Sequence, residues 1–94
     1  MSDLKYHQEK AKAQLEAWEA ELDKYRAETK MKEADEKAGL EKEIHKLESK
    51  FEEAKAKYNE MNSSGEQAWE SMKEGIVNAW QEISSAFDEA KSKF

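Results

Sequence analysis

The sequence predicts an all-α protein, an antiparallel helical hairpin with coiled-coil or three-helix-bundle packing, completed by dimerisation. Three observations lead to this prediction. Charged residues make up 40% of the 94 residues and hydrophobic residues 37%, a balance that is typical of long helices and coiled coils when Ala, Glu and Lys dominate. Proline is absent. Apolar side chains recur at the three- and four-residue spacings of one helix face. A chain of this length forms a single domain with a limited core.

The first element expected is a helix that starts near residue 3 and carries a narrow apolar seam, a line of apolar positions three, four or seven residues apart. These positions fall within a sector about 80° wide on a helix. The first seam consists of Leu4, Ala11, Leu15, Trp18, Leu22, Tyr25 and Thr29.

A second seam follows in unbroken four-three alternation, which is the a/d pattern of a coiled coil. It consists of Leu40, Ile44, Leu47, Phe51, Ala54, Tyr58 and Met61. The eleven-residue step from Thr29 to Leu40 relaxes a supercoil without breaking a helix. Gly39 costs only about 1 kcal/mol inside a helix. We therefore expect one helix over residues 3–62, with a break near residues 35–39 as the alternative.

A turn is predicted at residues 62–65, where Asn, Ser and Gly interrupt the apolar pattern. Ser63 stands three residues before Glu66, and Ser64 three before Gln67. Either pair can form a capping box at the start of the next helix, in which the serine oxygen accepts a backbone N–H.

The last helix, over residues 66–93, carries a third seam and folds back antiparallel because the turn is short. At about 1.5 Å per residue this helix spans roughly 43 Å and covers only residues 33–62. Gly75 is interpreted as a site of close helix approach rather than a hinge. The third seam consists of Trp69, Met72, Ile76, Trp80, Ile83, Phe87, Ala90 and Phe94.

The three seams predict which residues make contacts. The residues expected in the hairpin core are Phe51, Tyr58, Trp69, Ile76, Trp80 and Phe87. The residues left uncovered, and therefore expected between molecules, are Leu15, Trp18, Leu22 and Tyr25. A second copy covers them if the first 62 residues form one helix, so we expect a homodimer, with a higher oligomer or another protein partner as open alternatives. A break near residues 35–39 would instead close a three-helix bundle within one molecule.

Charge and composition exclude several classes of function. The net charge is −6, and basic residues have acidic neighbours at helical spacing. Lys32, for example, follows Glu28 by four residues. Nucleic-acid binding needs clustered cations, so we do not expect it. The absence of cysteine rules out disulfides and suits a reducing compartment, and we expect a cytoplasmic protein. The first residues lack the apolar core of a signal peptide, and no apolar run approaches membrane-spanning length.

No arrangement of residues predicts catalysis, a cofactor or a metal. His45 shares a helix face with Glu41 and Glu48, but a tight metal site needs three or four converging ligands, and His45 is expected to point into solvent. His7 is interpreted in the same way. The sequence contains no Gly-rich phosphate loop and no cysteine nucleophile. We therefore expect a protein that is not an enzyme.

The C-terminal third resembles small bacterial and cyanobacterial coiled-coil proteins that are described as stress-response proteins. The resemblance rests on Ser64-Gly65-Glu66-Gln67-Ala68-Trp69, Met72-Lys73-Glu74-Gly75-Ile76, Ala79-Trp80, Ile83 and Ala86-Phe87. It implies a helical fold and a stress-associated role.

The predicted function is a non-catalytic, self-associating coiled-coil module with a structural, interaction or stress-associated role. The alternative is an amphipathic protein that adsorbs to membrane surfaces or protects against desiccation, and that becomes more helical on lipid. The last helix carries three lysines against six acidic residues, which predicts weak attraction to anionic lipid.

Overall fold

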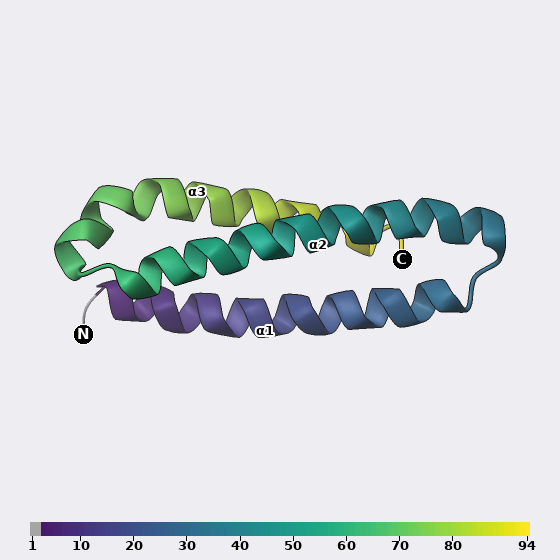
Figure 1. Ribbon diagram of the computed structural model, residues 1–94, viewed down its shortest axis with the longest axis horizontal. Coiled ribbons are helices and arrows are strands. Elements are labelled where there is room, and N and C mark those ends of the chain that lie inside the picture. Colours follow the sequence, from purple (N-terminus) through teal and green to yellow (C-terminus); the bar gives the residue numbers. More distant parts are fainter. Residues whose placement is uncertain (1–2) are drawn as a thin grey trace.

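A computed structural model describes residues 3–94 as three helices packed side by side in a rod of about 51 × 19 × 18 Å. The helices are α1 (Asp3–Lys30), α2 (Ala34–Ser63) and α3 (Glu66–Lys91). Each runs antiparallel to the one before it, so α1 and α3 are parallel and the α2–α3 turn lies beside the start of α1 (Figure 1). The prediction of an all-α protein with helix-on-helix packing is confirmed.

The expectation of one continuous helix over residues 3–62 is wrong, because the chain turns back at residues 31–33. The backbone N–H groups of Met31 and Lys32 donate to the carbonyls of Glu28 and Thr29 at 3.2 and 3.1 Å, which tightens the end of α1. Glu33 is then extended, with φ −72° and ψ 161°. The break comes before residues 35–39. These residues, Gly39 among them, lie inside α2.

The physical reason for the break is the burial that the turn makes available within one chain. Within the chain, α2 and α3 leave Trp18, Leu22 and Tyr25 of α1 5% exposed or less. Each large apolar side chain gains about 1.5–3 kcal/mol on burial. The sum over this seam exceeds the cost of interrupting a polar stretch of helix, so the one-chain three-helix bundle is the arrangement found.

The predicted turn between the second and third seams is found at Ser64 and Gly65, but the predicted capping boxes are not formed. Gly65 is the N-cap of α3, and no side chain in the described chain caps this helix. The Ser63 hydroxyl donates to the Glu60 carbonyl at 3.1 Å and the Ser64 hydroxyl to the Met61 carbonyl at 2.9 Å. Both serines therefore satisfy carbonyls at the end of α2 instead of N–H groups at the start of α3.

The core consists of two clusters that follow the three seams. The larger cluster joins Trp18, Leu22 and Tyr25 of α1, Ile44, Leu47 and Ala54 of α2, and Ile83, Phe87 and Ala90 of α3. The smaller cluster lies toward the α2–α3 turn and joins Leu4, Ala11, Met61, Trp69 and Ile76. The three seams predicted from the sequence all face this common core.

The parallel helices α1 and α3 contact each other largely through aromatic rings. Trp18 packs against Trp80 and stacks on Phe87, with ring centroids 5.2 and 5.1 Å apart. Tyr25 stacks on Phe94, three residues beyond the end of α3, at 4.2 Å. Burial raises the pKa of the Tyr25 phenol. Such ring pairs are worth about 0.5–1.5 kcal/mol beyond the area that they bury.

A polar contact joins α1 and α3 at the first turn of α1. The Asp3 carboxylate accepts hydrogen bonds from the Lys73 ammonium at 2.7 Å and from the Trp69 indole N–H at 2.9 Å. His7, one turn later, packs its ring on Trp69 at 5.2 Å. The hydrogen bond from Lys73, followed by that from Trp69, lowers the pKa of Asp3, and the same bond raises the pKa of Lys73.

Gly75 does not serve the close helix approach predicted for it. It is exposed, and a Cβ atom added there would meet no other group within 4 Å among the described residues. Its backbone has no positive φ. Nothing in the structure explains a glycine at this position.

Candidate functional site

The candidate site is a groove with an apolar floor between α1 and α2, which we call the α1–α2 groove. It encloses about 450 Å³, and among the described residues only these two helices line it. Its floor contains Leu15 and Leu22 of α1 and Phe51 and Tyr58 of α2. Leu22 is buried, whereas the other three are half-buried and reach the surface.

The floor of the groove repeats with a spacing that suits another helix. Leu15 and Leu22 are seven residues apart, as are Phe51 and Tyr58. On a helix, seven residues correspond to two turns or about 10.5 Å. The helices α1 and α2 are antiparallel, and Arg26 of α1 contacts Glu48 of α2. This register places Leu15 near the level of Tyr58 and Leu22 near the level of Phe51. Two apolar layers at this interval match a helix with apolar residues seven positions apart.

The walls of the groove are charged, with a surplus of acidic groups. The acidic residues are Glu16, Glu19, Asp23, Glu48 and Glu52, and the basic residues are Lys12, Arg26 and Lys55. Two of the three cations are already paired with carboxylates of the walls. The groove therefore presents negative charge on either side of its apolar floor.

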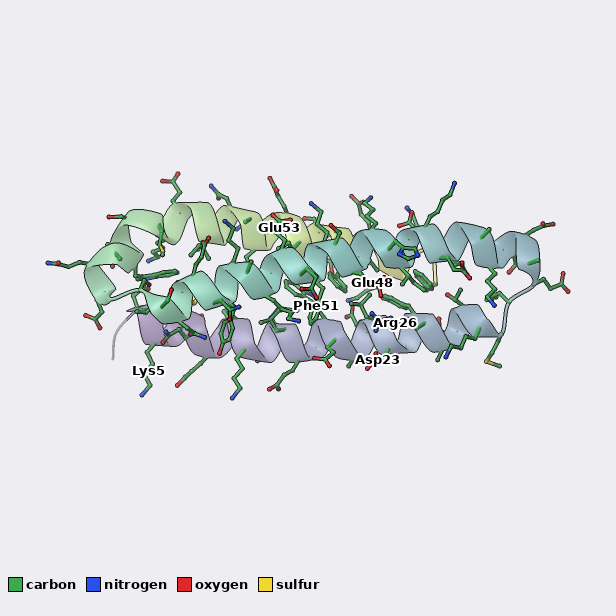
Figure 2. All side chains as sticks on the ribbon, in the orientation of Figure 1. Lys5, Asp23, Arg26, Glu48, Phe51 and Glu53 are labelled. Atoms are coloured by element: carbon green, nitrogen blue, oxygen red, sulfur yellow. The ribbon has the colours of Figure 1, made fainter. Side chains whose placement is uncertain are left out.

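Arg26 links the two walls at one end of the groove. Its guanidinium donates to Glu48 of α2 at 2.6 Å and to Asp23 of α1 at 2.9 Å, and Figure 2 shows these side chains beside Phe51. The hydrogen bond with Glu48 is the main cause of a raised pKa for Arg26. Because the Arg26 side chain is 40% exposed, solvent screens its ion pair with Glu48. This ion pair therefore positions the two walls more than it stabilises the fold.

Lys55 is the second paired cation. Its ammonium lies 3.4 Å from Glu52 and 5.6 Å from the centroid of the Phe51 ring. This contact holds the lysine along its own helix. Glu16 and Glu19 on α1 form no ion pair with another described residue, so their charges are available to a partner.

The structure separates the residues that the sequence predicted as one intermolecular surface. Trp18 and Tyr25 face the interior against α3, and Leu22 is buried at the floor of the groove, so only Leu15 of this set reaches the surface. Of the residues predicted for the hairpin core, Trp69, Ile76 and Phe87 are buried and Trp80 is half-buried; Phe51 and Tyr58 are half-buried in the groove.

Sequence reasoning did not find the charged walls of the groove. Arg26 and Glu48 are 22 residues apart, so no spacing within one helix relates them. Their contact depends on the antiparallel register of α1 and α2. That register follows from the turn at residues 31–33, which the sequence pattern did not place.

The remaining candidate groups are simple surface pairs. His45 is 79% exposed, with its ring nitrogen 3.5 Å from Glu48, and His7 lies 3.6 Å from Asp3. Within residues 3–94, no three His, Asp or Glu side chains converge as metal ligands would. None of the helices in this range combines the length and apolar character needed to cross a membrane.

Comparison of the chain with protein-family models, with curated proteins and with solved structures finds no match in any of the three.

Proposed function

We propose that this chain is a non-catalytic interaction module whose α1–α2 groove binds one amphipathic helix, which becomes the fourth helix of a bundle. The observation that carries the proposal is the pair of apolar layers, Leu15 with Tyr58 and Leu22 with Phe51, left open between two charged walls. A helix in such a groove is recognised through apolar anchors at i, i+3 or i+4, and i+7.

The acidic surplus of the walls decides which kind of helix fits. Five carboxylates against three cations line the groove, and Arg26 and Lys55 are already neutralised within it. Complementary charge sets specificity and association rate at a protein interface. The expected partner is therefore an amphipathic helix with lysine or arginine beside its apolar stripe.

Self-association, the role predicted from the sequence, loses the argument that motivated it. That argument required that the first seam stay uncovered within one chain. In the structure, α2 and α3 cover Trp18, Leu22 and Tyr25 of this seam. Two copies meeting groove to groove would also place acidic walls opposite each other, which is unfavourable. A stress-associated role stays a prediction from the resemblance of the C-terminal third. A cytoplasmic location is part of the proposal, since a cysteine-free chain needs no oxidising compartment.

The alternative of membrane adsorption requires the third seam to be available to lipid. Trp69, Ile83 and Phe87 are each 1% exposed or less, so adsorption would require the bundle to open. Circular dichroism with and without anionic vesicles checks this point. We expect unchanged helicity, and a marked rise on adding vesicles would favour the lipid-binding alternative.

The test of the proposal is binding of a designed helical peptide to the full chain. The peptide has about 18 residues, since shorter isolated helices are marginal, with Leu every third or fourth position and Lys elsewhere. A second peptide replaces each Lys by Glu. Isothermal titration calorimetry is expected to show the basic peptide binding at least about ten-fold more tightly, a difference of about 1.4 kcal/mol, with an affinity that falls as salt screens the charges.

A matched pair of variants locates the binding site on the groove. Glu52→Lys reverses a charge on the groove wall, whereas Glu53→Lys does so on the neighbouring residue, which does not line the groove and points away from it (Figure 2). Both residues are exposed and each pairs with a lysine three positions away. An exposed ion pair is worth about 0.2–1 kcal/mol, and a charge reversal replaces that attraction by a repulsion of similar size, a change of about 0.4–2 kcal/mol. Glu52→Lys should therefore weaken binding of the basic peptide by roughly two- to thirty-fold.

Three results would contradict the proposal. Equal effects of the two charge reversals would place the peptide elsewhere. Equal affinity for both peptides would remove the charge argument. A stable dimer of the chain alone at micromolar concentration, seen by sedimentation equilibrium, would restore self-association as the better function.

A further inference from the structure

A second concave site lies between α1 and α3 and shares no residue with the α1–α2 groove. It is a partly open cavity of about 140 Å³. Its inner walls are apolar and are formed by Ala11 of α1, Met61 of α2, and Trp69, Ile76 and Trp80 of α3.

The cavity exists because Ala11 interrupts a line of large side chains. On either side of it along α1, His7 packs on the Trp69 ring and Trp18 packs on the Trp80 ring, each with centroids 5.2 Å apart. These contacts hold the two indoles of α3 against α1. Ala11 is 2% exposed and contributes only a methyl group between them, so the space between the two ring pairs stays open.

The rim of the cavity supplies a cation. Lys10 lies at the opening, next to Ala11 in the chain. Its ammonium is 5.8 Å from the centroid of the Tyr6 ring, and within residues 3–94 it forms no ion pair. His7 and Gln81 complete the polar part of the rim.

The size and lining indicate the chemistry of the ligand. An apolar cavity of about 150 Å³ holds one benzene ring, and two indoles offer offset or edge-on contacts to such a ring. Lys10 lines the cavity, and its flexible stem allows the ammonium to turn from the Tyr6 ring to the opening, which favours a negative group on the ring. We propose that this cavity binds a monocyclic aromatic carboxylate, with its ring between Trp69 and Trp80 and its carboxylate at Lys10.

The experiment uses the full chain and two probes that share a benzyl group and carry opposite charges, phenylacetate and benzylamine. Binding is followed by isothermal titration calorimetry and by tryptophan fluorescence, because two of the three tryptophans line the cavity. Phenylacetate is expected to bind saturably and at least about ten-fold more tightly than benzylamine. Absence of saturable binding, or equal binding of both probes, would overturn the proposal.

Two variants and their controls assign the binding to the cavity. Ala11→Leu fills the space and should weaken phenylacetate at least about ten-fold, while Ala13→Leu, on the exposed side of α1, should leave it unchanged. Lys10→Glu should abolish the preference for phenylacetate, while Lys24→Glu, also exposed, should keep it. Lys10 is exposed, so its variant tests the site even if leucine at position 11 disturbs the fold. Unchanged binding by either cavity variant would refute the assignment.

Discussion

Replacing Ala34 by proline tests where the chain folds back. Ala34 is exposed and is the first residue of α2, a position where the backbone N–H has no partner within the helix and where proline is favoured. Glu33 before it is extended, with ψ 161°, as a residue preceding proline must be. Proline restricts the unfolded chain, so Ala34→Pro should raise the free energy of unfolding by up to about 1 kcal/mol. In a helix continuous over residues 3–62, it should cost about 3 kcal/mol or more.

Ala38→Pro is the matched control within the same helix. Ala38 is also exposed and lies four residues further into α2. Its N–H bonds to the carbonyl of Ala34, so proline removes this bond and clashes with that carbonyl. The expected loss is about 3 kcal/mol. A chain of 94 residues is expected to be stable by roughly 5–14 kcal/mol, so this loss is measurable.

Urea unfolding followed by far-ultraviolet circular dichroism measures both changes. Sedimentation equilibrium on the parent chain and on Ala34→Pro should give the monomer mass. A loss of about 3 kcal/mol for Ala34→Pro would mean that the helix runs through residue 34 in solution. Tolerance of Ala38→Pro with loss at Ala34→Pro would place the break near residues 35–39, and either outcome would refute the fold described above.

Three further predictions follow from the packing and the charges. Gly75→Ala should stabilise the chain by about 0.5–1 kcal/mol, because a methyl group at this exposed helical position has no neighbour within 4 Å from other parts of residues 3–94; a loss on urea unfolding would reveal a contact or conformation that the structure does not contain. Trp18→Ala should cost about 3–5 kcal/mol because Trp18 is 2% exposed in the larger core cluster, whereas the neighbouring exposed change Glu19→Ala should stay within about 0.5 kcal/mol; similar values for the two would show that Trp18 faces solvent. The pKa of Asp3 is lowered in the folded chain, mainly by Lys73, so its stabilising effect is present above the unfolded pKa of about 4 and is lost as the pH falls through the lower, folded value. Thermal unfolding should therefore show a smaller loss of stability with acid in Asp3→Asn than in the parent chain, and parallel pH profiles would contradict the role of this carboxylate.

The helices and their apolar faces could be predicted because they depend on local spacing. Trp69, Ile76, Ile83 and Phe87 follow a period that only a helix places on one side, and all four are buried. The turn at Ser64 and Gly65 was predictable because small polar residues interrupt this period. The predicted roles of the serines were wrong, because the same hydroxyls can accept from the next helix or donate to the previous one.

The candidate sites were less predictable, since they depend on distances between helices. The floor of the α1–α2 groove contains Leu15 and Phe51, which were predicted as contact residues without a shared location. The Arg26–Glu48 pair depends on the register between α1 and α2. The cavity beside Ala11 depends on how closely the aromatic rings of α1 and α3 pack. A single sequence does not specify those quantities.

By itself, the sequence determined the class of the protein, its three apolar seams and the second turn, because helical period and turn chemistry act over a few residues. Only the tertiary structure decided that the chain turns at residues 31–33 and not near Gly39. The local signal there is the cost of about 1 kcal/mol for a glycine inside a helix. Burial of Trp18, Leu22 and Tyr25 contributes several times as much to the free energy of folding. The same packing decided that α3 covers one side of the α1–α2 pair and leaves the groove on the other side open.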